Sequence, residues 1–118
     1  MRILSIETSC DETGAAVVEK KGNEHFAKVL SNVLASSATI QAQFGGVIPE
    51  QAAREQVKFI IPTIAEALLG SEKIERGSAE ENYKKANKIL KEKIDAIAVT
   101  HGPGLIGPLL VGVETAKA

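Results

Sequence analysis

The fold of this 118-residue chain is decided by residues 3–18, which run ILSIETSCDETGAAVV. Two apolar runs flank six residues, Thr8 to Thr13, that carry three hydroxyls, one thiol and two carboxylates. Gly14 then lets the chain reverse, so the stretch predicts a strand, a polar turn and a second strand. Hydroxyls and backbone N–H groups can donate to phosphate oxygens, and carboxylates can hold magnesium or position water. The turn therefore predicts a nucleotide site, with an ordinary polar turn as the alternative.

The composition indicates one soluble domain, or part of one. Apolar residues make up 44% of the chain, enough for a core, and charged residues make up 25%. Only 3% of the residues are aromatic and the net charge is -1, which argues against base stacking and against a general attraction to nucleic acid or membrane. The lone cysteine, Cys10, has no partner for an internal disulfide, and no segment resembles a membrane span or signal peptide. We therefore expect a cytoplasmic protein.

Apolar patterning predicts strands and helices that alternate along the chain. We expect strands at residues 2–7, 14–19 and 25–33, with a charged hairpin loop at 20–23. These three strands would form an antiparallel meander with the polar turn at one end. Residues 36–48 predict a loop.

A long helix is expected at residues 50–69, with Pro49 in its first turn and Gly70 at its end. Its apolar stripe is expected to consist of Ala53, Val57, Ile60, Ile61, Ile64 and Leu68. Pro62 lies opposite this stripe, so a kink there would bend the helix toward its apolar side. Phe59 falls off the stripe and is expected to face water, where it marks a partner surface unless a neighbouring loop covers it.

A second helix is expected at residues 79–91, after a linker at 70–78. Its inward residues are expected to be Tyr83, Ala86, Ile89 and Leu90. Its other face carries Lys84, Lys85, Lys88 and Lys91. Such a row favours a solvated helix face over a contact with a phosphate backbone.

The last third of the chain predicts a buried strand of the parallel type at residues 94–100 and a helix from about residue 108. Between them lies the glycine-rich turn His101-Gly102-Pro103-Gly104-Leu105-Ile106-Gly107. A strand, a glycine-rich turn and a helix N-terminus together form an anion-binding arrangement. The turn is not a Walker loop, because no Gly-Lys-Ser or Gly-Lys-Thr follows.

The predicted order of elements is strand, strand, strand, helix, helix, strand, helix. An antiparallel meander followed by a helix and a parallel strand matches the α/β subdomain shared by actin, hexokinase and the heat-shock ATPases, which is ribonuclease H-like. In that fold two subdomains enclose a nucleotide, and both glycine-containing turns face the cleft. We expect residues 1–118 to be one such subdomain without its second copy. The chain stops at Ala118 inside an apolar helix, so we also expect it to be a fragment.

Three motifs carry a family resemblance: IETSCDET at residues 6–13, FGGVIPE at 44–50 and HGPGLIGPLLVG at 101–112. In this order they resemble the TsaD family of tRNA threonylcarbamoyladenosine transferases, formerly called O-sialoglycoprotein endopeptidases. The second motif has the bacterial form. The resemblance covers nearly the whole chain, except for a longer, lysine-rich insert at about 70–93.

The resemblance implies an acyl transfer from threonylcarbamoyl-AMP to the adenosine beside the anticodon of tRNAs that read ANN codons. The nucleotide ligand is accordingly threonylcarbamoyl-AMP or ATP. The family also implies a divalent metal, iron or zinc, whose ligands would lie outside this chain. Neither His25 nor His101 is expected to bind it. The chain alone is expected to be inactive.

The resemblance places site residues in both turns. Those expected to line the cleft around the adenylate are Thr8, Ser9, Cys10, Asp11 and Thr13. Glu12, with Asp11, is the candidate base or amine-orienting group, unless it only organises the turn. Cys10 is not expected to be a nucleophile, since no histidine lies near it in the sequence to act as a base. The opposite wall is expected to be formed by His101, Gly102, Pro103 and Gly104.

The resemblance also implies partners. These are a TsaB-like paralogue that packs on the helix carrying Phe59, a TsaE-like ATPase, and tRNA in the full complex. No membrane is involved. The exposed half-cleft and the interrupted last helix predict marginal stability or self-association of the chain on its own.

Two other readings of the sequence compete. An acetate- or sugar-kinase-like phosphotransferase would share the fold, although the carboxylate pair after Ser9-Cys10 is not typical of those kinases. A non-catalytic TsaB-like paralogue would keep the glycine-rich turn, but Asp11 and Glu12 argue against it. The old peptidase assignment has no support, since the sequence shows neither a zinc-binding histidine pair nor a nucleophile beside a base.

Overall fold

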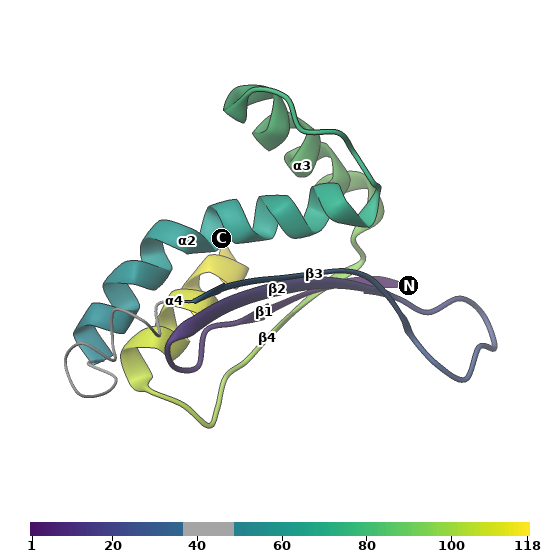
Figure 1. Ribbon diagram of the computed structural model, residues 1–118. Coiled ribbons are helices and arrows are strands. Elements are labelled where there is room, and N and C mark those ends of the chain that lie inside the picture. The colour runs from purple at the N-terminus through teal and green to yellow at the C-terminus, as the bar shows by residue number, and fades with distance from the viewer. Residues whose placement is uncertain (37–48) are drawn as a thin grey trace.

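The computed structural model describes residues 1–36 and 49–118, which form an α/β fold around a four-stranded sheet (Figure 1). The elements are β1 (Arg2–Glu7), β2 (Glu12–Glu19), β3 (Lys28–Ser36), α2 (Pro49–Ser71), α3 (Ala79–Lys93), β4 (Ala96–Val99) and α4 (Ile106–Lys117). The strands lie in the order β3-β2-β1-β4, with β4 parallel to β1 and the other pairs antiparallel. This arrangement confirms the predicted meander extended by a parallel strand.

Helices α2 and α4 lie side by side on one face of the sheet, and α3 packs on α2 (Figure 1). The core between them consists of Leu4, Ile6, Val17, Ile60, Ala65, Leu68, Leu69, Ala86 and Ile89. Among the described residues no helix covers the opposite face of the sheet. Strand β4 also lies at the edge of the sheet, and Ile97, which pairs with Leu4 and shares its helix-side face, is 43% exposed. The strand is therefore exposed on both faces, which corrects the expectation of a strand buried on both faces. No helix in the described ranges combines the length and apolar character needed to cross a membrane.

The strand boundaries differ from the prediction after β1. Strand β2 begins at Glu12 rather than Gly14, because its first residues still pair with the end of β3. The hairpin loop runs to residue 27, so β3 begins three residues later than expected. The loop predicted at 36–48 lies outside the described residues, apart from Ser36, which ends β3. Helix α2 continues through Pro62 and past Gly70 to Ser71, two residues beyond its predicted end.

The buried face of α2 coincides only in part with the predicted apolar stripe. Its buried residues include Gln56, Ile60, Thr63 and Ala67, which recur at helical spacing. Val57 and Ile61, assigned to the stripe, are 63% and 51% exposed. The prediction is confirmed for Ile60 and Leu68, which are buried, and is wrong for Val57 and Ile61, because the polar residues Gln56 and Thr63 take part in the buried face.

Helix α3 follows its prediction more closely. Ala86 and Ile89 are buried, and the four lysines of the outer face are exposed. Tyr83, expected to face inward, is 43% exposed. Ser78 caps the helix by accepting a hydrogen bond from the N–H of Glu81.

Candidate functional site

The two turns singled out in the sequence touch each other. The N–H of Leu105 donates to the carbonyl of Ser9 at 2.8 Å. A Cβ atom on Gly104 would lie 2.5 Å from that same oxygen and 2.8 Å from the Cβ of Ser9. Only glycine permits this approach, because real Cβ atoms do not come so close to other atoms. The predicted convergence of the polar turn and the glycine-rich turn is therefore confirmed.

Thr8 joins the end of β1 to α4. Its hydroxyl donates to the carbonyl of Pro108 at 2.6 Å and accepts from the N–H of Gly112 at 3.1 Å. In a regular helix this N–H and this carbonyl, four residues apart, would be hydrogen-bonded to each other. A Cβ on Gly112 would lie 2.5 Å from the Thr8 hydroxyl oxygen, so here too only glycine permits the side chain of Thr8 to pack against α4.

Gln56 holds the polar turn from the side of α2. Its side-chain nitrogen donates to the backbone carbonyls of Thr8, Cys10 and Glu12 at 3.3, 3.1 and 3.1 Å. Gln56 was not predicted from the sequence as a residue of the site. The only local signal was a glutamine within an apolar helix, and the predicted apolar stripe did not include it.

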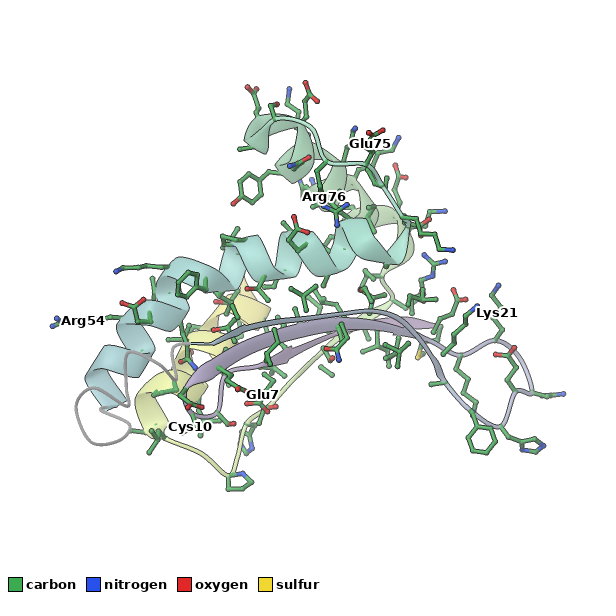
Figure 2. The ribbon with its side chains drawn as sticks, in the orientation of Figure 1. Glu7, Cys10, Lys21, Arg54, Glu75 and Arg76 are labelled. Carbon is green, nitrogen blue, oxygen red and sulfur yellow. The ribbon has the colours of Figure 1, made fainter. Side chains whose placement is uncertain are left out.

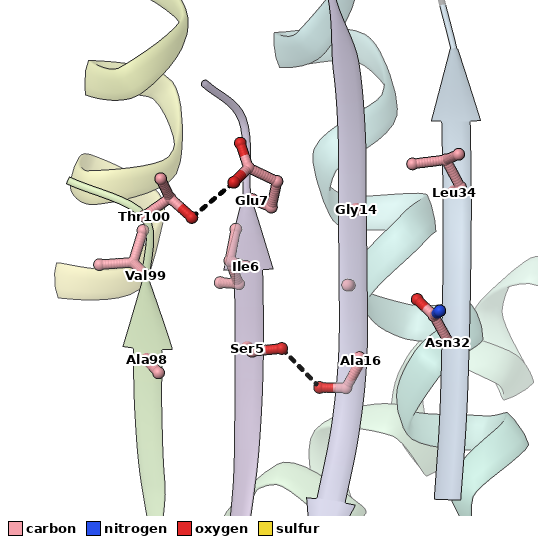
Figure 3. Close-up of a pocket in the computed structure, with 11 residues that line it drawn as sticks. Ser5, Ile6, Glu7, Gly14, Ala16, Asn32, Leu34, Ala98, Val99 and Thr100 are labelled. Atoms are coloured by element: carbon pink, nitrogen blue, oxygen red, sulfur yellow. Dashed lines mark hydrogen bonds between the residues drawn. The ribbon is translucent and has the colours of Figure 1, made fainter. Parts of the chain in front are cut away.

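Glu7 and Thr100 end neighbouring parallel strands and meet at the same edge of the sheet (Figure 3). The hydroxyl of Thr100 donates to Glu7 Oε2 at 2.7 Å, and the N–H of Ser9 donates to Glu7 Oε1. Partial burial alone would raise the pKa of Glu7, but the hydrogen bonds from Ser9 and Thr100 outweigh it and hold the pKa below its ordinary value. Both residues line a cavity of about 380 Å³ on the sheet face opposite the helices.

The predicted site residues fall into two groups. Thr8 and Thr13 are buried, so their side chains have no open surface toward a ligand, and their predicted ligand contacts stay predictions. Half-buried or exposed at the meeting of the turns are Ser9, Cys10, Asp11, Glu12, His101, Gly102, Pro103 and Gly104. Figure 2 shows Glu7 and Cys10 together at this end of the sheet, with Lys21 at the far end.

The start of α4 completes the site. Leu105 is its N-cap residue and makes no side-chain capping hydrogen bond. The N–H groups of Ile106 and Gly107, in the first turn, therefore have no cap from that side chain, and a helix N-terminus favours an anion. The site can thus offer N–H donors on the α4 side and carboxylates on the β1–β2 side.

Among the side chains that the structure describes, no three from His, Cys, Asp or Glu gather into a metal-ligand set. The metal that the family resemblance implies therefore does not fit the described part of this chain.

Replacing Gly112 with alanine is expected to destabilise the fold by about 1–3 kcal/mol, because the new methyl group would overlap the Thr8 hydroxyl. Urea unfolding followed by circular dichroism measures the change. The matched control is Gly14→Ala, whose new Cβ would meet its nearest neighbour at an ordinary 3.7 Å. Equal stability of the two variants would contradict the close packing of Thr8 on α4.

The lowered pKa of Glu7 predicts a specific acid dependence of stability. The ionised form stabilises the folded chain at neutral pH, and this contribution is lost as the pH falls from 4.5, the ordinary value, through the lower pKa of the folded state. Glu7→Gln should therefore flatten the acid side of the stability curve measured between about pH 7 and pH 3. Glu92→Gln, exposed on α3, serves as the control and should keep the wild-type slope.

The sequence of this chain is similar to the sequences of known proteins. The family model described as "TsaD: tRNA N6-adenosine threonylcarbamoyltransferase" matches residues 28–118. Proteins of that name are 50% identical to this chain in Bartonella bacilliformis and 46% identical in Symbiobacterium thermophilum. The matches cover 100% and 98% of this chain but only 28% of each relative.

Among solved structures, the PPX-GPPA enzyme of Aquifex aeolicus matches with a TM-score of 0.37 and 16% identity, over 86% of this chain and 36% of that one. The sequence matches are far stronger. Since the family model spans more than half of the residues, and the acidic turn and the glycine-rich turn meet as that resemblance requires, the chain belongs to the TsaD family.

Proposed function

We propose that this chain forms the part of a threonylcarbamoyltransferase that holds threonylcarbamoyl-AMP. The acceptor is the exocyclic amine of the adenosine beside the anticodon in tRNAs that read ANN codons. The observation that carries the proposal is the contact of the Ser9 carbonyl with Gly104 and Leu105, which joins an acidic turn to a helix N-terminus. Membership of the TsaD family supports the reaction class. A compartment that contains tRNA is needed, so a cytoplasmic location belongs to the proposal.

The reaction is acyl transfer from a mixed anhydride. The adenosine amine attacks the carbamoyl carbon, a C–N bond forms, and the bond from that carbon to the phosphate oxygen breaks. AMP leaves with the electron pair, and the amine gives up one proton. Glu12 is exposed beside the site and takes this proton, while half-buried Asp11 orients the amine. The N–H groups at the start of α4 face the phosphate, where negative charge stays on the leaving group.

Glu12→Gln is expected to lower the rate of threonylcarbamoyl transfer by about 10²–10⁴-fold, the range for removal of a general base. The assay uses the full-length protein that carries this chain, with its partners, and follows radiolabelled threonine into tRNA. The control is Glu80→Gln, exposed on the first turn of α3, which should keep wild-type activity. Release of ADP with a phosphorylated small molecule, and no labelled tRNA, would instead favour the phosphotransferase alternative.

We further propose that a TsaB-like paralogue docks on the outer surface of α2 and α4, within a complex that also includes a TsaE-like ATPase and tRNA. The support is apolar exposure on two helices that lie side by side (Figure 1). The exposed apolar side chains on them are Val57, Phe59, Ile61, Ile106 and Leu110. Phe59, which the sequence placed off the core face, is 38% exposed.

Removing the Phe59 ring is expected to weaken binding to the paralogue at least about fivefold, since buried aromatic anchors dominate such interfaces. Isothermal titration of Phe59→Ala against the paralogue measures the dissociation constant. Tyr83→Ala, a comparable exposed aromatic on α3, is the control and should bind like the wild type. Unchanged affinity of the Phe59 variant would rule out this surface.

A further inference from the structure

The side-chain amide of Gln56 makes an unusual contact with the polar turn. The residue is 1% exposed, and its one nitrogen faces three carbonyl oxygens from alternate residues, Thr8, Cys10 and Glu12. An amide nitrogen carries two hydrogens, so at least one of them is shared between two carbonyls. The turn is therefore wrapped around a single donor group.

This contact fixes the direction of the turn's other backbone groups. Within the described residues the only cis peptide bond joins Gly102 to Pro103, so the peptides of the polar turn are trans. In a trans peptide the carbonyl and the following N–H point in opposite directions. Because the carbonyls of Thr8 and Cys10 point at Gln56, the N–H groups of Ser9 and Asp11 point away from α2. The Ser9 N–H accordingly reaches the carboxylate of Glu7.

The burial of Gln56 carries a free-energy cost, and good packing alone does not explain why the protein accepts it. Gln56 Oε1 is buried and has no hydrogen-bond partner among the described residues. Leaving such an oxygen unpaired disfavours the folded state. An apolar residue, like Ile60 one turn later on the same face, would avoid that cost but would leave the turn without its donor. A buried polar group that is only partly satisfied requires an explanation beyond packing.

We propose that Gln56 is a positioning residue for the transferase site. Its amide turns the carbonyls of the polar turn inward, and so presents the outer side of the turn, with Asp11 and Glu12, to the bound adenylate. The inference rests on the proposed function for its kinetic consequence, but not for its geometry. Gln56 itself touches no substrate.

Two variants of the full-length protein distinguish hydrogen-bond donation by the Gln56 amide from the packing of its side chain. Gln56→Leu keeps most of the volume and removes the donor, and it should lower kcat/KM for threonylcarbamoyl-AMP at least about tenfold. Gln56→Glu places a carboxylate against three carbonyls, but its protonated form can donate one hydrogen bond. Its kcat/KM should therefore rise, relative to that of the wild type, as the pH is lowered from about 8 to about 6, since burial raises the pKa of a carboxyl group.

Thr63→Val is the matched control, because Thr63 is also polar and buried and lies two turns later on the same face of α2. It should alter stability without altering kcat/KM or its pH profile. A folded Gln56→Leu variant with kcat/KM within about twofold of the wild type would overturn the inference. So would a Gln56→Glu variant whose pH profile parallels that of the wild type.

A spectroscopic measurement covers the case in which Gln56→Leu does not fold. In the wild-type protein, NMR should detect couplings across the hydrogen bonds from the Gln56 amide to the turn carbonyls, and slow exchange of the amide protons. Rapid exchange without couplings would also overturn the inference. If the wild type shows these signals but transfers nothing to tRNA, the proposed function fails while the positioning geometry stands.

Discussion

The structure depends on one close approach of two backbone segments that are about a hundred residues apart. The Thr8 hydroxyl fits against α4, and the Ser9 carbonyl receives the N–H that begins the helix. Neither contact would exist if Gly104 or Gly112 carried a side chain. The sheet makes the approach possible, because β1 and β4 are parallel neighbours whose carboxyl ends reach the same edge. Glycine then lets the two turns touch there.

Much of this arrangement can be predicted from local sequence signals. The apolar runs predict strands β1 and β2, and the glycine-rich turn predicts the start of α4. The turns that follow β1 and β4 then come together, because the carboxyl ends of neighbouring parallel strands lie at the same end of the sheet. Burial on α2 could not be predicted in the same way. Gln56 and Thr63 look like residues of a solvated face, and only the tertiary structure gives them partners that make their burial tolerable.

Roles within the turn were harder to predict than its position. A threonine hydroxyl suits a phosphate as well as a helix carbonyl, so no sequence signal assigns Thr8 to the interior rather than to the cleft. The exposure of β4 has a similar origin. An apolar strand indicates burial, but which of its faces is covered depends on elements distant in sequence. The meeting of Glu7 and Thr100 could have been predicted, since Glu7 is the last residue of β1 and Thr100 directly follows the parallel strand β4.

The charges of the site constrain how the proposed ligand lies in it. Glu7, Asp11 and Glu12 all belong to the β1–β2 side, and the lowered pKa of Glu7 keeps that carboxylate ionised at neutral pH. A phosphate placed among them would be repelled. The start of α4 attracts an anion, so the phosphate belongs on the α4 side. In the proposed reaction the carboxylates then lie toward the amine, which must lose a proton for transfer to be complete. On the buried side of the turn, Gln56 holds the carboxylate-bearing segment and Thr8 ties that segment to the start of α4.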